Sequence, residues 1–379
     1  MISGLRADTE YKITVKALSA TRKKNAKTIF EKTKKHLIEA IYSLPLAEYG
    51  FFRFDHCIKT AENGFLLDAY VFKYGKYLQA IMKTDQYLNI IWTYYTEPES
   101  RSQIMECKSG GFLIISGNEI FKLNKTGQRL WRQTTDEKEE SWYGGCESSN
   151  GDIILIGATT KKRTEDGVPY VASFITKLSN SGSIVWTKYG GEKLVNHLYK
   201  ILQNEVSNFF IMGETSGNVS FLEIDHDGNV IWEKFYQNGR NYLSPKNMQE
   251  TPDGHYFISA TQTLYQFGRF GFAPCFMKVA KDGTVIWDKV HPNLHGGGLS
   301  PSASASEVQP DNSSIVLTVD DRGVGLAKLS SDGDVIDHRA FYGYPSGIYV
   351  SAISENQCVF FTHNGYFIIV NWDGHYNQL

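Results

Sequence analysis

Short apolar runs alternate with glycine-containing turns along most of this chain, and the alternation recurs at a similar interval. Its most regular part is an apolar run led by lysine, then a turn, then the pattern Gly-x-x-x-Trp. The complete copies contain Gly127 and Trp131, Gly182 and Trp186, Gly228 and Trp232, and Gly283 and Trp287. A copy at Leu88–Trp92 lacks the glycine, and one at Gly333–Asp337 lacks the tryptophan. This recurrence predicts one repeated domain.

A second apolar run precedes each of these units. The seven runs begin at Gly64, Gly111, Gly151, Asn208, Gly254, Ser314 and Cys358. Successive tryptophans from Trp92 to Trp287 lie 39, 55, 46 and 55 residues apart. Short strands at this period are typical of four-stranded propeller blades, whereas helical repeats need 3.6-residue periodicity. The sequence therefore predicts an all-β fold: a seven-bladed β-propeller over residues 51–379, with an N-terminal extension of a strand and a helix over residues 1–50.

The residues of the repeated unit suit this predicted place in a blade. Asp-Gly, Ser-Gly and Thr-Gly supply the positive φ that a tight hairpin requires. The Val-Ile and Ile-Val pairs before tryptophan are β-branched, which predicts a buried strand. The indole is predicted to fill the wedge between neighbouring blades. Where Asp337 replaces tryptophan, the junction is predicted to be weaker or to be packed by Phe341 and Tyr342.

The repeated Gly-x-x-x-Trp, over residues 54–379, resembles the docking motif of pyrroloquinoline-quinone-type propellers and of PQQ-like binding propellers. The resemblance implies a propeller and leaves the function open. Quinone-dependent members of that superfamily have eight blades and a vicinal cysteine pair near a calcium site. This chain has seven predicted blades and no adjacent cysteines, so no quinone or other cofactor is expected.

Residues 1–50 differ in pattern from the rest. Thr9–Leu18 alternates apolar and polar positions, which predicts a strand. The preceding Leu5-x-Ala7-x-Thr9-x-Tyr11 resembles the tyrosine corner of a fibronectin type III module. Two interpretations remain open: the segment ends one module of a longer modular protein, or the likeness is due to chance.

A basic cluster from Arg22 to Lys35 overlaps apolar residues at helical spacing from Phe30 to Leu44, and Pro45 ends the pattern. This predicts a basic amphipathic helix that packs its apolar stripe on the main domain; a helix on a membrane or on RNA is the alternative. A strand within Tyr11–Leu18 or Tyr49–Phe54 is predicted to complete the last blade, because that blade is short after Gly374.

Composition and charge exclude several classes of partner. The net charge is −2 and the sequence pI is about 6.6, so no global field recruits nucleic acid. No apolar run reaches the roughly 18 residues that span a bilayer, and the N-terminus has no signal-peptide core. We expect a monomer without nucleic acid or a membrane span. Its expected location is cytoplasmic as the sequence is written, or extracellular if the chain is part of a modular protein.

The five cysteines are odd in number and widely scattered, without a Cys-x-x-Cys pair. Neither a disulfide framework nor a thiolate zinc site is predicted. Their predicted role is that of small buried residues in strands.

Candidate binding residues lie in the longer connections. Loops between blades should open on the same face as the loops between the two middle strands of each blade, where Thr159–Ser173 and Thr261–Cys275 are long. Aromatic and arginine side chains there suit stacking on a sugar or peptide and gripping a carboxylate; a loop folded over its own aromatic groups is the alternative. The candidate ligand-binding residues are Tyr265, Phe267, Arg269, Phe270, His291, His295, Tyr344 and Trp142.

Two further motifs contain residue types that are used in metal binding or acid–base chemistry. His291 and His295 precede a Gly-Gly-Gly run, but no nearby Cys, Asp or Glu completes a coordination set. Asp225-His226-Asp227-Gly228 resembles the first half of a calcium loop and lacks the later ligands. No metal site and no catalytic residue is therefore predicted.

The sequence favours a non-catalytic propeller that binds a protein partner or a glycan through one loop face. One alternative is a carbohydrate-active lyase or hydrolase that uses His291 or His295 with a tyrosine. A second alternative is a structural module of a larger modular protein. A central mouth lined mainly by aromatic side chains and glycine backbone would favour binding, whereas a mouth lined by paired carboxylates or by histidine beside tyrosine would favour catalysis.

Overall fold

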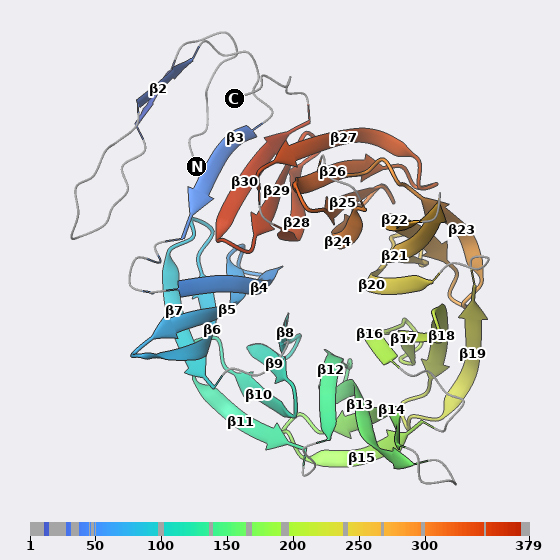
Figure 1. The fold of residues 1–379 in the computed structure, drawn as a ribbon. Helices are drawn as coiled ribbons and strands as arrows, with labels where there is room; N and C mark the ends of the chain where they lie inside the picture. Colours follow the sequence, from blue (N-terminus) through green and yellow to red (C-terminus); the bar gives the residue numbers. More distant parts are fainter. Residues whose placement is uncertain are drawn as a thin grey trace.

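The computed structural model describes residues 11–14, 28–31, 38–44, 46, 49, 51–97, 102–135, 139–163, 169–190, 197–237, 242–266, 269–296, 300–344 and 346–372. Every regular element within these ranges is a β-strand, with no helix among them. Seven four-stranded antiparallel sheets form the ring seen in Figure 1, which confirms the predicted seven-bladed β-propeller.

The first strand of each blade lies nearest the central axis, and the later strands follow outward to the rim (Figure 1). Blade 1 contains β4 (Phe51–Lys59), β5 (Phe65–Lys73), β6 (Lys76–Thr84) and β7 (Ile90–Thr96); blade 2 contains β8 (Ser102–Glu106), β9 (Phe112–Ser116), β10 (Glu119–Leu123) and β11 (Arg129–Thr134). Blade 3 contains β12 (Glu140–Glu147), β13 (Ile153–Arg163), β14 (Pro169–Leu178) and β15 (Ile184–Tyr189); blade 4 contains β16 (His197–Gln203), β17 (Phe209–Thr215), β18 (Asn218–Ile224) and β19 (Val230–Tyr236). Blade 5 contains β20 (Leu243–Glu250), β21 (Tyr256–Gln266), β22 (Arg269–Val279) and β23 (Val285–Val290); blade 6 contains β24 (Ser302–Val308), β25 (Ser314–Val319), β26 (Gly323–Leu329) and β27 (Val335–Tyr342). Blade 7 contains β28 (Gly347–Ser354), β29 (Gln357–Thr362), β30 (Tyr366–Asn371) and β3 (Ile38–Ser43).

Ring closure differs from the sequence prediction. The strand β3 pairs antiparallel with β30, with Tyr42 opposite Phe367, so an early segment of the chain completes the last blade. Both predicted closing segments were wrong, because Tyr11–Thr14 forms β1 elsewhere and Phe51 begins the inner strand β4. The predicted helix was also wrong over β3. The apolar residues there fit either period, and the edge of β30 supplies the hydrogen-bonding partner that decides for a strand.

Outside the propeller, β1 (Tyr11–Thr14) pairs with β2 (Thr28–Glu31) in a separate two-stranded sheet. The strand predicted near Tyr11 is therefore present. Residues 5–9 of the fibronectin-like motif lie outside the described residues, as do residues 22–27 and 32–35 of the basic cluster.

Each repeated tryptophan packs on the repeated glycine of the next blade. A Cβ added to Gly333 would lie 2.6 Å from the Trp287 ring, and one added to Gly182 would lie 2.5 Å from the Trp131 ring. Both glycines have positive φ, +79° and +87°, so only glycine meets both the conformation and the close approach. The Trp287 indole also donates a hydrogen bond to the Ser331 carbonyl at 3.2 Å. The indoles therefore fill the predicted wedge.

The residue before each tryptophan is exposed, contrary to the prediction of a buried strand. Val185 is 56% exposed and Ile286 is 49% exposed, and Ile91, Leu130 and Ile231 are exposed as well, as is Ile336 before Asp337. These residues lie in the outermost strands, where no further strand covers them. Their β-branched or apolar side chains thus support the extended backbone more than they fill a core.

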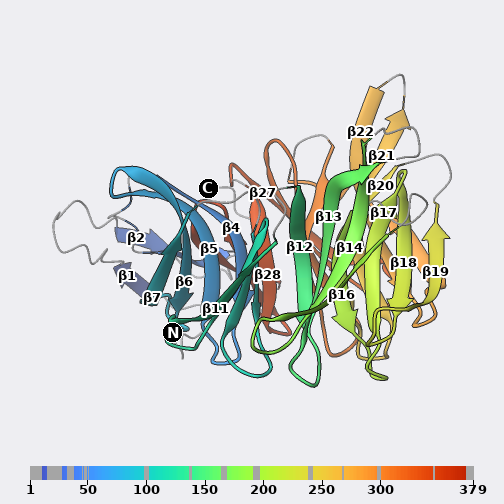
Figure 2. The ribbon, with the colours of Figure 1, turned by 90° about the horizontal axis from the view of Figure 1, so that it is seen from below.

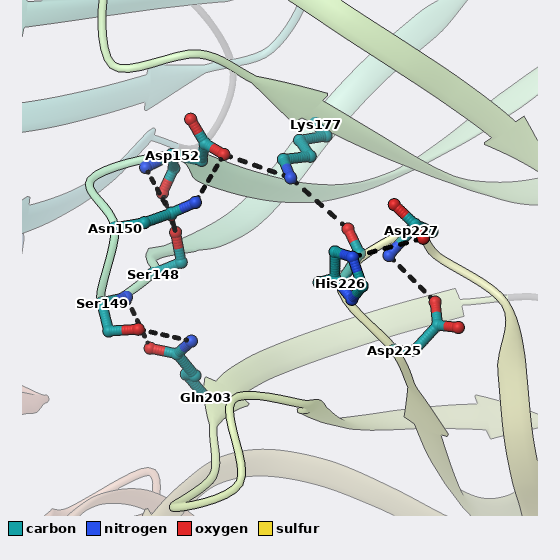
Figure 3. A network of polar contacts seen from close by, with 9 residues as sticks. All are labelled: Ser148, Ser149, Asn150, Asp152, Lys177, Gln203, Asp225, His226 and Asp227. Carbon is teal, nitrogen blue, oxygen red and sulfur yellow. Dashed lines mark hydrogen bonds and ion pairs between the residues drawn. The ribbon is translucent and has the colours of Figure 1, made fainter.

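In blades 3 and 5 the repeated lysine ties the third strand of the blade to the turn between its first two strands. The Lys177 ammonium lies 3.1 Å from an Asp152 carboxylate oxygen, and Lys278 lies 2.5 Å from Asp253. Figure 3 shows the first pair, with Lys177 also reaching the His226 carbonyl of blade 4 at 3.5 Å. The lysine in the repeat therefore acts as a crosslink within a blade.

Blade 4 reverses this crosslink. Glu223 replaces the lysine, and the turn supplies amides, since Asn204 and Asn208 each donate to Glu223 at 2.9 Å. The Trp232 indole donates to its other oxygen at 2.6 Å. The exception in the repeat is thus matched by polar partners that suit a carboxylate.

Side chains of one blade also cap the turn of the preceding blade. Gln203 accepts from the Ser149 amide at 2.7 Å (Figure 3), and Glu147 accepts from the Ser109 amide at 3.0 Å. Glu106 accepts from the Ala61 amide at 2.7 Å. These bonds satisfy backbone donors that a tight turn leaves open.

The junction between blades 6 and 7 lacks the repeated indole because Asp337 stands in its place, and the Trp372 side chain is buried in the apolar cluster that the two blades share. Arg339 pairs with Asp337 at 2.8 Å and donates to the Trp372 carbonyl at 3.0 Å. Phe341 is buried against Phe360, with ring centroids 5.2 Å apart. The predicted packing by Phe341 is therefore confirmed, whereas Tyr342 was wrongly placed there because it is 61% exposed.

All five cysteines are buried and free. Burial raises the pKa of the Cys107, Cys146 and Cys275 thiols to about 12, which keeps them protonated and unreactive near neutral pH.

Candidate binding face

The two faces of the propeller are defined by the connections that they carry. The turn face carries the turns between first and second strands and between third and fourth strands, including the Gly-x-x-x-Trp turns. The loop face carries the hairpins between second and third strands and the connections between blades. Hydrogen bonds join these last two sets: the Thr135 amide donates to the Asn118 carbonyl at 2.9 Å, and the Gly343 amide to the Arg322 carbonyl at 2.8 Å.

Three hairpins extend the loop face. In Figure 2 the β21–β22 hairpin plainly reaches farther toward the upper side than its neighbours. The strands explain this, because β13, β21 and β22 have 11 residues each whereas β9 and β10 have 5. The segments predicted as long loops were therefore misjudged: most of 159–173 and of 261–275 continues the strands of two blades.

Three predicted binding residues, Tyr265, Arg269 and Phe270, lie at the end of β21–β22. Tyr265 pairs with Phe270 and Gln266 pairs with Arg269 across the hairpin, and Phe267 lies outside the described residues. The hairpin therefore brings Tyr265, Arg269 and Phe270 to one end of the loop face. Next to them, Phe272 is 49% exposed, and Gly271 approaches the Ser300 hydroxyl of the following connection.

The two predicted histidines contact different residues. The His291 ring packs on Phe276, with centroids 5.8 Å apart, and hydrogen-bonds to the Gly333 backbone. Burial lowers the pKa of His291 against the effect of that bond. The His295 ring lies 6.2 Å from the ring of His338, whose pKa is lowered by burial and by His295. Histidine rings packed on other rings suit a structural role better than proton transfer.

Tyr344 and Trp142 belong to the core more than to a surface. Half-buried Tyr344 packs edge-on against Phe341 and Phe360, with centroids 6.4 Å away in each case. Trp142 is only 1% exposed, and its indole nitrogen lies 3.4 Å from the Thr176 hydroxyl. A ligand on the loop face cannot stack on Trp142 without a rearrangement of the core.

An aromatic hairpin tip that sequence reasoning missed lies in blade 1. Tyr74 and Gly75 form a two-residue turn with φ of +55° and +76°, the geometry of a type I′ hairpin. Tyr74 is 77% exposed, Tyr77 47% and Phe72 36%. The available signal was the dense run of aromatic residues from Tyr70 to Tyr77 around a Tyr-Gly turn.

Exposed aromatic side chains gather on the loop face. Those near loop-face strand ends are Tyr42, Phe72, Tyr74, Tyr77, Tyr189, Phe235, Tyr242, Phe272, Tyr342 and Tyr366. Among the residues whose exposure the structure describes, two exposed aromatic residues lie elsewhere: Tyr143 is within β12, and Tyr87 is in a turn of the opposite face. The two faces thus differ in chemistry as well as in loop length.

Among the described residues, no group of three or more His, Cys, Asp or Glu side chains is placed to hold a metal ion. In the same part of the chain, no helix has the length and apolar character needed to cross a membrane.

Comparisons with known proteins agree on the fold. No protein-family model and no curated protein sequence matches the chain. Among solved structures, virginiamycin B lyase from Staphylococcus aureus has a TM-score of 0.55 at 10% identity, covering 87% of this chain and 98% of the other. The Neurospora crassa Pan2 WD40 domain has a TM-score of 0.54 at 9% identity, covering 91% and 98%. Puromycin hydrolase has a TM-score of 0.52 at 9% identity, covering 83% and 50%. At such identities the likeness extends to the propeller fold alone.

Proposed function

We propose that this chain is a non-catalytic, monomeric propeller that binds a partner, either a protein or a glycan, through its loop face. The observation that carries the proposal is the gathering of exposed aromatic side chains on that face. Exposed aromatic clusters on a rigid scaffold mark binding surfaces because they bury large areas at little cost in side-chain entropy. The turn face offers less, since its turns are engaged in contacts with the adjoining blades.

The packing of each indole on the next glycine supports a relation to PQQ-like binding propellers. The catalytic alternative, a lyase or hydrolase that uses His291 or His295, finds less support. The two rings pack on different partners, and burial lowers the pKa of His291. A general acid or base has to reach its substrate at hydrogen-bonding distance, which favours binding without turnover.

The test uses a glycan array and a phage-displayed peptide library, both screened with the full chain. Every ligand captured is measured again with four loop-face variants, Tyr77→Ala, Tyr265→Ala, Arg269→Ala and Phe272→Ala. Tyr87→Ala on the turn face is the matched control. We expect at least one loop-face variant to weaken each ligand and the control to weaken none. Capture of no ligand, or loss of binding in Tyr87→Ala alone, contradicts the proposal. Product formation from a polysaccharide that is lost in His291→Ala assigns the enzyme class.

A further inference from the structure

Lys200 lies in β16, the first strand of blade 4, which is one of the strands nearest the axis (Figure 1). It is not the lysine of the repeat, whose place Glu223 takes in this blade. Among the described residues, the Lys200 side chain has neither a hydrogen-bond acceptor nor a carboxylate partner. Lys177 and Lys278, by contrast, each pair with a carboxylate. The charge of Lys200 is therefore not used to hold the blades together.

The surroundings of Lys200 direct its ammonium toward the axis. Its partner on the neighbouring strand, Met212, is fully buried in the core cluster that blades 4 and 5 share. The next residue, Ile201, packs on the other side in the cluster that contains Cys146 of blade 3. The second strand and both neighbouring blades thus cover three sides of this part of β16. Because the Lys200 side chain is only partly buried, its ammonium meets solvent along the axis.

The Lys200 ammonium lacks a counter-charge. Burial lowers the pKa of Lys200, and the Cys146 thiol acts in the opposite direction. Burial also raises the pKa of that thiol to about 12, so Cys146 is neutral near pH 7 and does not balance a cation. A partly buried ammonium without a counter-ion costs free energy. A bound anion would recover that cost, because opposite charges attract more strongly where water is partly excluded.

A second cation acts on the same thiol. Burial raises the pKa of Cys146, and the charges of Lys108 and Lys200 both act against that rise. Lys108 belongs to the turn between β8 and β9, is exposed, and has no partner within the described part of the chain. The two lysines come from blades 2 and 4, the neighbours of the blade that carries Cys146. They create positive potential near the inner strands of a chain whose net charge is −2.

The repeat shows that the fold does not require a cation at this place. Six of the first strands contain a β-bulge, and Lys200 is the residue at which pairing resumes after the bulge of blade 4. The corresponding residues of the other five blades are His56, Gly144, Asn247, Ala305 and Tyr349. None of these five is a lysine or arginine. A charge that breaks the local pattern without serving the fold is expected at a functional site.

We propose that Lys200 binds a small anion, a carboxylate or a phosphate, beside β16 near the axis, with Lys108 as a second and weaker cation. An ammonium suits either group, since it donates hydrogen bonds and supplies the opposite charge. The site lies on the inner strands, and it does not depend on the proposed function of the loop face.

The experiment measures the melting temperature of the full chain with succinate, citrate, inorganic phosphate and glucose 6-phosphate, with sodium chloride holding the ionic strength constant. Glucose is the neutral comparison for its phosphate ester. We expect at least one anion to raise the melting temperature, by an amount that grows with the logarithm of its concentration. Titration calorimetry then gives the dissociation constant of that anion.

The lysine variants test the assignment. Lys200→Met removes the charge at nearly the same length and should weaken the anion by about tenfold or more, the size of one charged hydrogen bond. Lys200→Arg keeps the charge and should retain binding. Lys108→Met should weaken it by about two- to fivefold, because this charge is exposed. The control is Lys281→Met, which alters a turn-face lysine that is paired with Glu205 at 2.6 Å and should change nothing.

The ligand-free chain supplies an independent readout. Lys200→Met should melt about 1–3 °C above the unchanged chain, because an apolar side chain replaces a charge without a partner. A lower melting temperature would show that the chain itself compensates the charge, and it overturns the proposal. So does the absence of a rise with every anion, equal affinity of Lys200→Met and the unchanged chain, or equal binding of glucose and glucose 6-phosphate. Stronger binding of the two phosphates than of succinate and citrate assigns a phosphate, and the reverse order assigns a carboxylate.

Discussion

The turn face and the loop face belong to the same seven sheets, yet only the turn face repeats. On the turn face an indole meets the next blade's glycine at five junctions, and Lys177, Glu223 and Lys278 bind the turn between the first two strands of blades 3, 4 and 5. On the loop face hairpins differ in length from blade to blade. The recurring residues of the turn face hold the ring together. The loop face carries less of that constraint, so its hairpins can vary in length and form a binding surface.

The largest effect is expected from opening the ring. A chain that begins at residue 44 lacks β3, whereas one that begins at residue 38 keeps it and serves as the control. The first should melt more than about 10 °C below the second, because the pairing of β3 with β30 closes blade 7. Differential scanning calorimetry measures this. Equal melting temperatures would show that the ring of blades is stable without the pairing of β3 with β30.

The next effect tests the repeated wedge. Trp287→Ala should lower the free energy of unfolding by about 3–5 kcal/mol, since the cavity removes contacts with Gly333 and with the Phe257 ring. Asp337→Ala at the matching position of blade 6 should cost about 1 kcal/mol, because it removes one partly exposed ion pair. Urea unfolding compares the two. Similar costs would mean that the indole adds little to its junction.

The reversed crosslink of blade 4 is a finer test of the turn face. Glu223→Lys should cost about 1–3 kcal/mol, because the Asn204 and Asn208 amides and the Trp232 indole lose their acceptor. Adding Asn208→Asp supplies a carboxylate at the place of Asp152 in blade 3 and should recover part of the loss. The double-mutant cycle gives the coupling energy. A coupling energy near zero would mean that Glu223 and Asn208 do not act as a pair that replaces the lysine and aspartate of blade 3.

Acid should destabilise the fold partly through two histidines: His291 in the connection between blades 5 and 6, and His338 in β27 of blade 6. Burial lowers the pKa of His291 and of His338 below the ordinary value of 6.5. The unfolded chain then binds these protons first as pH falls, so stability present above about pH 6.5 is lost below it. Unfolding at about pH 7.5 and 5.5 should show a smaller pH effect in His291→Asn with His338→Asn. If the double variant loses as much stability between these pH values as the unchanged chain, neither histidine causes the acid sensitivity.

The smallest effect is expected from exposed aromatic residues of the loop face. Phe272→Ala and Tyr342→Ala should change the free energy of unfolding by less than about 0.5 kcal/mol, because these rings are 49% and 61% exposed. Urea unfolding again provides the measurement. Costs close to that of Trp287→Ala would mean that the loop face also carries the stability of the ring.

The sequence predicted much of the turn face because its causes are local. Gly-x-x-x-Trp identifies the turn, the strand after it and the ring that fills the next junction. The exceptions are also visible in the sequence, as Glu223 and Asp337. Their partners Asn204, Asn208 and Arg339 lie 19 residues or fewer away, but their pairing follows only from the folded blade.

The loop face could be predicted only in outline. Tyr265, Arg269 and Phe270 were placed on the expected face, yet in strands instead of a loop. Trp142 was taken for a surface residue and lies in the core. The exposed rings of Phe72, Tyr74 and Tyr77 in blade 1 were missed because exposure depends on the packing of neighbouring parts of the chain.

By itself, the sequence determined the all-β class, the seven blades and the glycine–indole wedge, since each depends on backbone conformation and on spacing within one repeat. The tertiary structure decided that β3 closes the ring, because an amphipathic segment takes the period of the edge that it meets. It also decided which aromatic rings face solvent, because burial depends on the height of the neighbouring blade and not on the residue itself.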